Sequence, residues 1–165
     1  MNENDQFHGV QKIVSGGQTG VDQAALDVAM KLGIPHGGWC PRGRISEAGR
    51  IDTKYQLTEL PSRDYAARTQ QNVIDSDGTL ILYRVRLQGG TALTYRLAKE
   101  FDKPLQRVRL DRPWNAQRVA LWLREHEIRI LNVAGPRASS HPQLYEQSFQ
   151  ALLQLFGSPS SLLLP

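Results

Sequence analysis

The feature that most constrains the fold is a repeated alternation between short apolar runs and helical patterns. It is clearest in KIVSGGQTGVDQAALDVAMKLG, residues 12–33, where a β-type run ends in glycines and a helical pattern begins at once. Apolar side chains in residues 21–32 recur every three to four positions, which predicts a helix, and Gly33 stands at the position of a C-cap. The alternation continues to about residue 156. It predicts an α/β fold, a Rossmann-like three-layer α/β/α sandwich with a mainly parallel sheet.

The expected elements follow from the apolar runs and from the glycines and prolines between them. We expect strands over residues 12–15, 34–40, 78–84, 103–110 and 128–135, with a weaker extended piece at 56–60. We expect helices over residues 21–32, 65–75, 88–101, 113–126 and from the loop 136–142 to about 156. Residues 41–55 are expected to be a long polar loop, and the final residues from 157 a loosely held tail. The whole chain, 1–165, is expected to be a single domain with its core over about 12–156.

Composition narrows the classes of function. With 40% hydrophobic and 22% charged residues, the chain is typical of a globular protein. It contains neither a run of the roughly 20 apolar residues that span a membrane nor a signal-peptide core, so we expect a cytoplasmic protein without a membrane partner. The single cysteine, Cys40, excludes an internal disulfide, and the four histidines lack metal-ligand spacing, so no metal site is expected. The net charge of +4 would suit nucleic acid, but without blocks of like charge we expect no nucleic-acid partner.

Three predicted strands end in a glycine-rich turn before a helix: SGGQTGVD (15–22), LQGGTALT (87–94) and VAGPRASS (133–140). The start of a helix leaves amide N–H groups without partners and carries partial positive charge, and glycine lets an anion approach them closely. We therefore expect a phosphate-binding cradle where these loops meet. The candidate binding residues are Gly16, Gly17, Gln18, Thr19, Gly20, Gly89, Gly90, Thr91, Gly135 and Arg137. The alternative is that these glycines only permit sharp reversals of the chain.

The polar loop that begins at Cys40 supplies further candidates. Arg42 and Arg44 are positioned to clamp a phosphate, and Glu47 is a weak candidate for an acid or base. The alternative is a solvated loop with internal ion pairs. Asp22 is a second weak catalytic candidate, although a carboxylate in the first turn also complements the helix dipole. For Cys40 we favour a buried structural thiol over a nucleophile, because no base is predicted beside it.

Several of these segments together resemble the putative molybdenum carrier family: SGGQTGVDQAALDVA, GGWCPRGRISEAGRID, YAARTQQNVIDSDGTLIL, GGTALT and LNVAGPRAS. The resemblance covers about residues 12–156. It implies a Rossmann-like fold related to the Lonely Guy, or lysine-decarboxylase-like, group. It also implies homo-oligomers and an anionic ligand of nucleotide or cofactor size at the strand ends. The family name implies molybdenum cofactor, a pterin that carries a phosphate.

The chain departs from the Lonely Guy pattern at one place. Those phosphoribohydrolases carry PGGxGTxxE, whose glutamate takes part in cleaving an N-glycosidic bond, whereas LQGGTALTYR has Thr94 or Tyr95 near that position. The leading hypothesis is therefore a binding protein for a phosphorylated small molecule, either molybdenum cofactor or a nucleotide. The first alternative is a nucleotide-derivative-processing enzyme of the phosphoribohydrolase kind, with Asp22 or Glu47 as catalytic candidates. The second alternative is a basic protein associated with nucleic acid.

Overall fold

Five parallel strands form the central sheet in the computed structural model, which describes residues 3–157. They are β1 (Lys12–Val14), β2 (His36–Gly37), β7 (Gly78–Tyr83), β8 (Leu105–Arg109) and β9 (Ile130–Ala134). Their order across the sheet is β2-β1-β9-β7-β8. Counted from β9 and then through β1, β2, β7 and β8, this order reads 3-2-1-4-5, the order of a Rossmann sheet. The predicted Rossmann-like fold is confirmed, but its central strand comes last along the chain.

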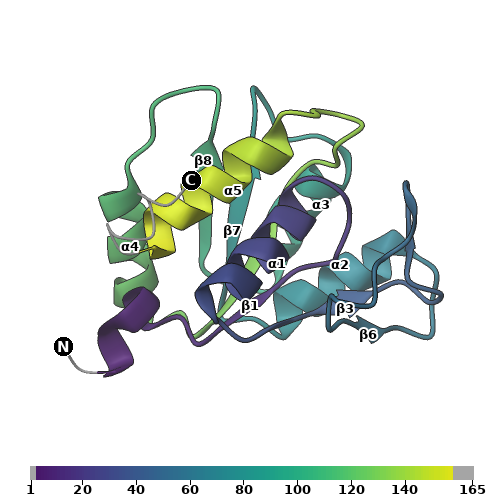
Figure 1. The fold of residues 1–165 in the computed structure, drawn as a ribbon, viewed down its shortest axis with the longest axis horizontal. Helices are drawn as coiled ribbons and strands as arrows, with labels where there is room; N and C mark the ends of the chain where they lie inside the picture. The colour runs from purple at the N-terminus through teal and green to yellow at the C-terminus, as the bar shows by residue number, and fades with distance from the viewer. Residues whose placement is uncertain (1–2, 158–165) are drawn as a thin grey trace.

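Helices cover both faces of the sheet (Figure 1). One face carries α1 (Val21–Leu32), α4 (Ala116–Glu125) and α5 (Leu144–Phe156), and the other carries α2 (Tyr65–Ile74) and α3 (Gly89–Glu100). A short 3-10 segment, η1 (Glu3–Gly9), packs against α4 and α5. The helix predicted over 21–32 is confirmed at both ends, and Gly33 has the left-handed conformation of a C-cap, with φ 71°.

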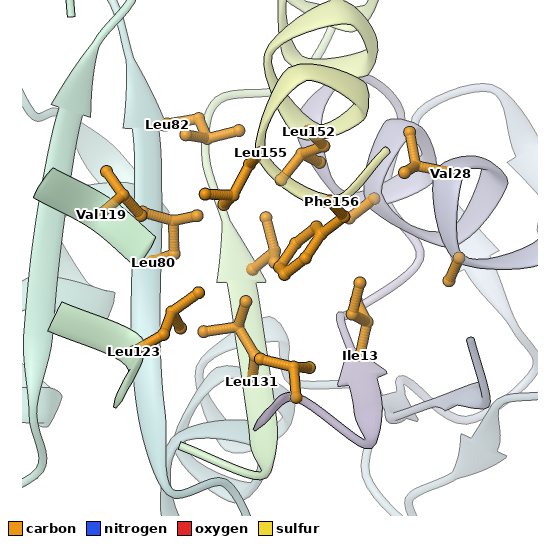
Figure 2. Close-up of a cluster of buried hydrophobic side chains, with 14 of the residues drawn as sticks. Ile13, Val28, Leu80, Leu82, Val119, Leu123, Leu131, Leu152, Leu155 and Phe156 are labelled. Carbon is orange, nitrogen blue, oxygen red and sulfur yellow. The ribbon is translucent and has the colours of Figure 1, made fainter. Parts of the chain in front are cut away.

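The main core lies between the sheet and the face covered by α1, α4 and α5. Figure 2 shows side chains from three strands meeting side chains from these three helices, among them Ile13, Val28, Leu80, Leu82, Val119, Leu123, Leu131, Leu152, Leu155 and Phe156. A smaller cluster joins α2 and α3 on the opposite face. Burial of these apolar side chains is the main favourable contribution to the free energy that holds the layers together. The core fixes the strands, so the loops at their carboxyl ends start from fixed positions.

The strand predicted over 34–40 is broken in the structure. Gly38, with φ 127°, separates β2 from β3 (Trp39–Cys40), and β3 leaves the sheet to pair with β6 (Thr58–Glu59). A Cβ atom at Gly38 would lie 2.1 Å from the carbonyl oxygen of Ser15, so only glycine fits this crossing. The apolar run alone could not show this break.

Three further boundaries differ from the sequence-based expectation or fall outside the structure. The polar loop 41–55 contains a hairpin of β4 (Ile45–Ser46) and β5 (Gly49–Arg50). The helix expected from Pro113 begins at Ala116, because Asn115 caps it by accepting a hydrogen bond from the amide of Arg118. The expectation for the tail from residue 158 onward lies outside the described residues.

Candidate functional site

A cavity of about 520 Å³ opens beyond the carboxyl ends of β1, β7 and β9. Its walls come from the loops that follow these three strands and from residues of α1, α2 and α3. It therefore lies where β9 meets β7, the place at which the order of a Rossmann sheet reverses and at which open α/β sheets bind their ligands. Among the candidate residues, the structure brings Gln18, Asp22, Gly89–Thr91, Gly135 and Arg137 to this cavity.

The loop between β7 and α3 presents open main-chain amides to the cavity. The amides of Gly89 and Gly90 make no hydrogen bond within residues 3–157. A Cβ atom added at either glycine would meet no atom within 4 Å, so this helix start is accessible. The aligned peptide dipoles of a 12-residue helix place partial positive charge here. This loop has the chemistry expected of an anion-binding helix start.

Arg86 is brought to the same helix start by a strained turn that the sequence did not reveal. Val85, an exposed β-branched residue, has φ 59°, and the amide of Arg86 donates to the carbonyl oxygen of Arg84 at 2.6 Å. With the amide of Gln88 turned so that its oxygen faces Arg86, that oxygen accepts from Nε at 2.6 Å and from Nη2 at 2.8 Å. The guanidinium is thereby held beside the start of α3. The sequence feature that could have identified Arg86 as a site residue was its position two residues before QGGT.

The loop between β1 and α1 differs from the expectation, because its glycines serve internal packing. The amide of Gln18 donates to Oδ2 of Asp22 at 3.2 Å, and that of Gly17 donates to Oγ of Ser15 at 3.3 Å. A Cβ atom at Gly16 would overlap the guanidinium of Arg68, and one at Gly20 would lie 2.6 Å from the carbonyl oxygen of Pro136. Gly16, Gly17 and Gly20 do not line the cavity, whereas Gln18 of this loop and Asp22 in the first turn of α1 do.

Asp22 and Arg68 form a buried ion pair at the base of the cavity. Arg68 Nη1 lies 3.3 Å from Asp22 Oδ2, and the two side chains are 12% and 6% exposed. Burial raises the pKa of the Asp22 carboxyl, while Arg68 and the Gln18 amide act in the opposite direction. Burial likewise lowers the pKa of Arg68, and Asp22 opposes that shift. Asp22 is a candidate from the sequence, whereas Arg68 is not, because its partner lies 46 residues away along the chain.

The loop between β9 and α5 contributes Arg137 to the cavity. Its guanidinium carbon lies 4.4 Å from the ring centroid of Tyr65, which also lines the cavity and was missed by the sequence analysis. Gly135, in contrast, is required for packing, because a Cβ atom there would lie 2.3 Å from the carbonyl oxygen of Leu82. Gly135 is thus tightly packed, whereas Gly89 and Gly90 at the start of α3 have open surroundings.

The arginines of the polar loop do not face the cavity. Arg44 is buried, and its guanidinium donates to the carbonyl oxygens of Ile51, Asp52 and Tyr55 at 2.7–3.1 Å, which fixes the loop internally. Arg42 is exposed and lies outside the cavity wall. Cys40 is fully buried, and burial raises the pKa of its thiol, which agrees with a structural role.

Glu47 and Thr19 meet beside the cavity, although neither lines it. The Glu47 carboxylate accepts hydrogen bonds from the hydroxyls of Thr19 and Ser139 and, at 3.1 Å, from the amide of Ser139. The hairpin of β4 and β5 is thereby joined to the loop after β9, 92 residues away. The sequence analysis named Glu47 but not Ser139.

The contacts of Glu47 predict a pH-dependent attachment of the hairpin. The hydrogen bonds from Ser139 and Thr19 lower the pKa of Glu47. Because the folded-state pKa is depressed, this attachment should be complete above the ordinary glutamate value of about 4.3 and lost as the pH falls through the folded-state pKa. The amide shift of Ser139, followed by NMR between about pH 2 and 6, should report a midpoint below about 4.3. A midpoint at or above that value would contradict the attachment.

Asp22 is the one carboxylate among the residues that line the cavity within the described chain. Thr94, near the position of the Lonely Guy glutamate, donates through its hydroxyl to the carbonyl oxygen of Gly90.

Within residues 3–157, no group of three His, Cys, Asp or Glu side chains is arranged to hold a metal ion. In the same part of the chain, every helix lacks the length and hydropathy that a membrane span requires.

Comparisons with known proteins agree with this architecture. A family model described as the circularly permutated YpsA SLOG family matches residues 13–156. The chain is 47% identical to a protein of solved structure from Syntrophus aciditrophicus SB that is described as a putative molybdenum carrier protein. The match covers 90% of this chain and 96% of that one, with a TM-score of 0.87. Among the curated proteins, none matches.

The permuted strand order, with the central strand β9 last along the chain, agrees with the description of the matching family. The match spans nearly all of the sheet and its helices. The resemblance seen in the sequence is confirmed by the family model and by the solved relative. The chain belongs to the circularly permutated YpsA SLOG family.

Proposed function

We propose that this protein binds a small molecule that carries a phosphate group, with the phosphate at the start of α3. The observation that carries the proposal is the pair of amides at Gly89 and Gly90, which make no hydrogen bond within residues 3–157 and lie at a cavity lined by three arginines. Arg68, Arg86 and Arg137 outnumber the single carboxylate, Asp22, so the cavity favours an anion. A helix start and a nearby guanidinium together provide main-chain and charge-assisted hydrogen bonds to phosphate oxygens.

The cavity wall also contains polar atoms that lack a partner. Within the described residues, Oε1 of Gln18 and Nε of Arg68 are shielded from solvent and make no hydrogen bond. Nε2 of Gln18 donates to the carbonyl oxygen of Ile45 at 3.0 Å, which fixes the orientation of this side chain. A shielded polar atom without a partner costs about 1–3 kcal/mol. An ordered water or a ligand group that reached these atoms would remove that cost.

The size of the cavity and the name of the relative give two candidates for the rest of the ligand. About 520 Å³ is within the ordinary range for small-molecule sites and accommodates a nucleotide. The relative is described as a putative molybdenum carrier protein, and molybdenum cofactor is a pterin whose phosphate the start of α3 would hold. Arg86, Gly89 and Gly90 fit that phosphate as well as they fit that of a nucleotide. Mass and absorbance of the ligand retained after gentle purification distinguish the two.

Hydrolysis of a glycosidic bond is supported less well by the same geometry. It would need a carboxylate in the cavity, and Asp22 already accepts hydrogen bonds from Arg68 and the Gln18 amide through Oδ2. Release of adenine and ribose 5-phosphate from AMP, abolished by Asp22→Asn with AMP binding retained, would establish the enzyme instead.

Replacing Arg86 with alanine is expected to weaken the binding of AMP by about tenfold or more, because a charge-assisted hydrogen bond to phosphate is lost. Isothermal titration calorimetry with AMP and with inorganic phosphate measures the effect. Arg96→Ala is the matched control, since Arg96 is an exposed arginine of α3 that does not line the cavity. Equal losses in both variants would show a general charge effect, and no binding of either probe by the unaltered protein would refute the proposal.

A further inference from the structure

Glu47 carries an internal negative charge into the loop that follows the central strand. Its carboxylate accepts from the amide and hydroxyl of Ser139 and from the hydroxyl of Thr19. That hydroxyl in turn accepts from the amide of Ala138 at 3.3 Å. One main-chain amide and two hydroxyls thus converge on one carboxylate, and a second amide, that of Ala138, holds one of these hydroxyls. This is the donor set that loops after parallel strands use for phosphate.

The strand order of the sheet shows why the position of the Glu47 carboxylate matters for ligand binding. β9 is the first strand of the sheet when the strands are counted in Rossmann order. In Rossmann proteins, the loop after that strand holds the pyrophosphate of a dinucleotide. Here the corresponding loop, residues 135–143, already holds the carboxylate of Glu47. The start of α3, which lines the same cavity, has no such occupant within residues 3–157.

We infer that Glu47 fills a second anion seat, formed by Thr19 and Ser139, and thereby restricts the ligand to one with a single phosphate group. This inference rests on the proposed function, because it takes the start of α3 as the seat of that phosphate. A second phosphate near Ser139 meets a negative charge and finds the donors occupied, which disfavours diphosphates and dinucleotides. Glu47 is therefore a specificity residue, and it excludes the wrong ligand without contacting the right one.

The hairpin that carries Glu47 is anchored independently of this contact. Arg44 donates to three carbonyl oxygens of residues 51–55, and Gln18 donates to the carbonyl oxygen of Ile45. Removal of the Glu47 side chain therefore leaves the hairpin in place and the seat open. Glu59 is a matched control: it lies in β6, and its carboxylate accepts from the Gly43 amide at 2.7 Å, away from the cavity.

The first test maps inorganic phosphate onto the main-chain amides by NMR. In the unaltered protein and in Glu59→Ala, phosphate should shift the amides of Gly89 and Gly90 and leave that of Ser139 unchanged. In Glu47→Ala the Ser139 amide should respond as well, with an affinity at least about tenfold higher than in the unaltered protein. Glu47→Gln, which removes the charge but keeps an acceptor, should fall between the two and serves if the alanine variant does not fold.

The outcomes separate this inference from the proposed function. A Ser139 response of equal affinity in the unaltered protein and in both Glu47 variants would overturn the inference, and so would a silent Ser139 amide in all three. Silence at Gly89 and Gly90 in every protein would instead count against the proposed function. A Ser139 response confined to the Glu47 variants would then still establish the second seat.

The second test compares AMP with ADP, which differ by one phosphate. The unaltered protein should bind AMP more tightly than ADP. Glu47→Ala should raise the affinity for ADP relative to AMP by about tenfold, while Glu59→Ala leaves the ratio unchanged. A ratio that does not respond to Glu47→Ala, or an unaltered protein that prefers ADP, would overturn the restriction to one phosphate.

Discussion

Replacement of Arg68 by alanine should lower the free energy of unfolding by about 3–5 kcal/mol, the usual cost of breaking a buried ion pair from one side. The substitution leaves the Asp22 carboxylate, 6% exposed, without its cationic partner. It also removes the side chain that packs against Gly16, where a Cβ atom would lie 1.7 Å from Nη1 of Arg68. Urea unfolding followed by circular dichroism measures the change.

Further measurements test whether this loss of stability comes from the unpaired buried charge. Arg68→Ala combined with Asp22→Asn should be more stable than Arg68→Ala alone, because the unpaired charge is gone. Burial raises the pKa of Asp22, and in Arg68→Ala the opposing effect of Arg68 is gone, so the folded state binds the extra proton and stability should fall as the pH rises above the ordinary aspartate value of about 3.9. Arg96→Ala, at an exposed position, should stay within about 0.5 kcal/mol of the unaltered protein. A loss under about 1 kcal/mol for Arg68→Ala would contradict the role of the pair.

Gly135→Ala should cost about 3 kcal/mol or more, at the upper end of what overpacking costs. A Cβ atom there would lie 2.3 Å from the carbonyl oxygen of Leu82 and 2.5 Å from Cγ2 of Val21. Main-chain atoms of a central strand cannot move aside cheaply, so β7 and β9 would have to separate. Thermal and urea unfolding both measure the effect.

Gly90→Ala is the matched control for Gly135→Ala. It adds the same methyl group in the first turn of α3, where nothing lies within 4 Å. Alanine is the better helix former, so this variant should be as stable as the unaltered protein or more stable, by up to about 1 kcal/mol. Similar losses in both variants would show that the surroundings of the two glycines do not differ as described.

The layers of the fold could be predicted from the sequence, but the detailed path of the chain could not. The periodicity from Val21 to Leu32 predicted α1 at both ends, because apolar spacing and the cap glycine are local signals. The break at Gly38 could not be predicted, because it depends on the carbonyl oxygen of Ser15, which only the folded chain brings close. The hairpin of β4 and β5 was invisible for a related reason, since its strands are two residues long and mostly polar.

The place of the cavity at the strand ends could be predicted from the sequence, but several of the residues that line it could not. Glycine-rich turns mark the strand ends in the sequence. The sequence does not show, however, whether the space left by the missing Cβ atom is open to a ligand or filled by other atoms of the protein. Gly90 faces open space, whereas Gly16 faces Arg68. Arg68 and Arg86 were missed because their roles depend on a partner 46 residues away and on a strained turn at Val85. Tertiary contacts of this kind leave no periodic trace in a sequence.

The contact between η1 and α5 bears on how a sheet with this strand order can arise. The imidazole Nε2 of His8 lies 2.7 Å from the carbonyl oxygen of Leu155, so the segments before β1 and at the end of α5 are already neighbours. A short peptide joining them, together with a cut in the turn between α4 and β9, would produce a gene that reads β9 first and encodes the same molecule. Every packing contact of the five strands would survive, because only the order of translation changes.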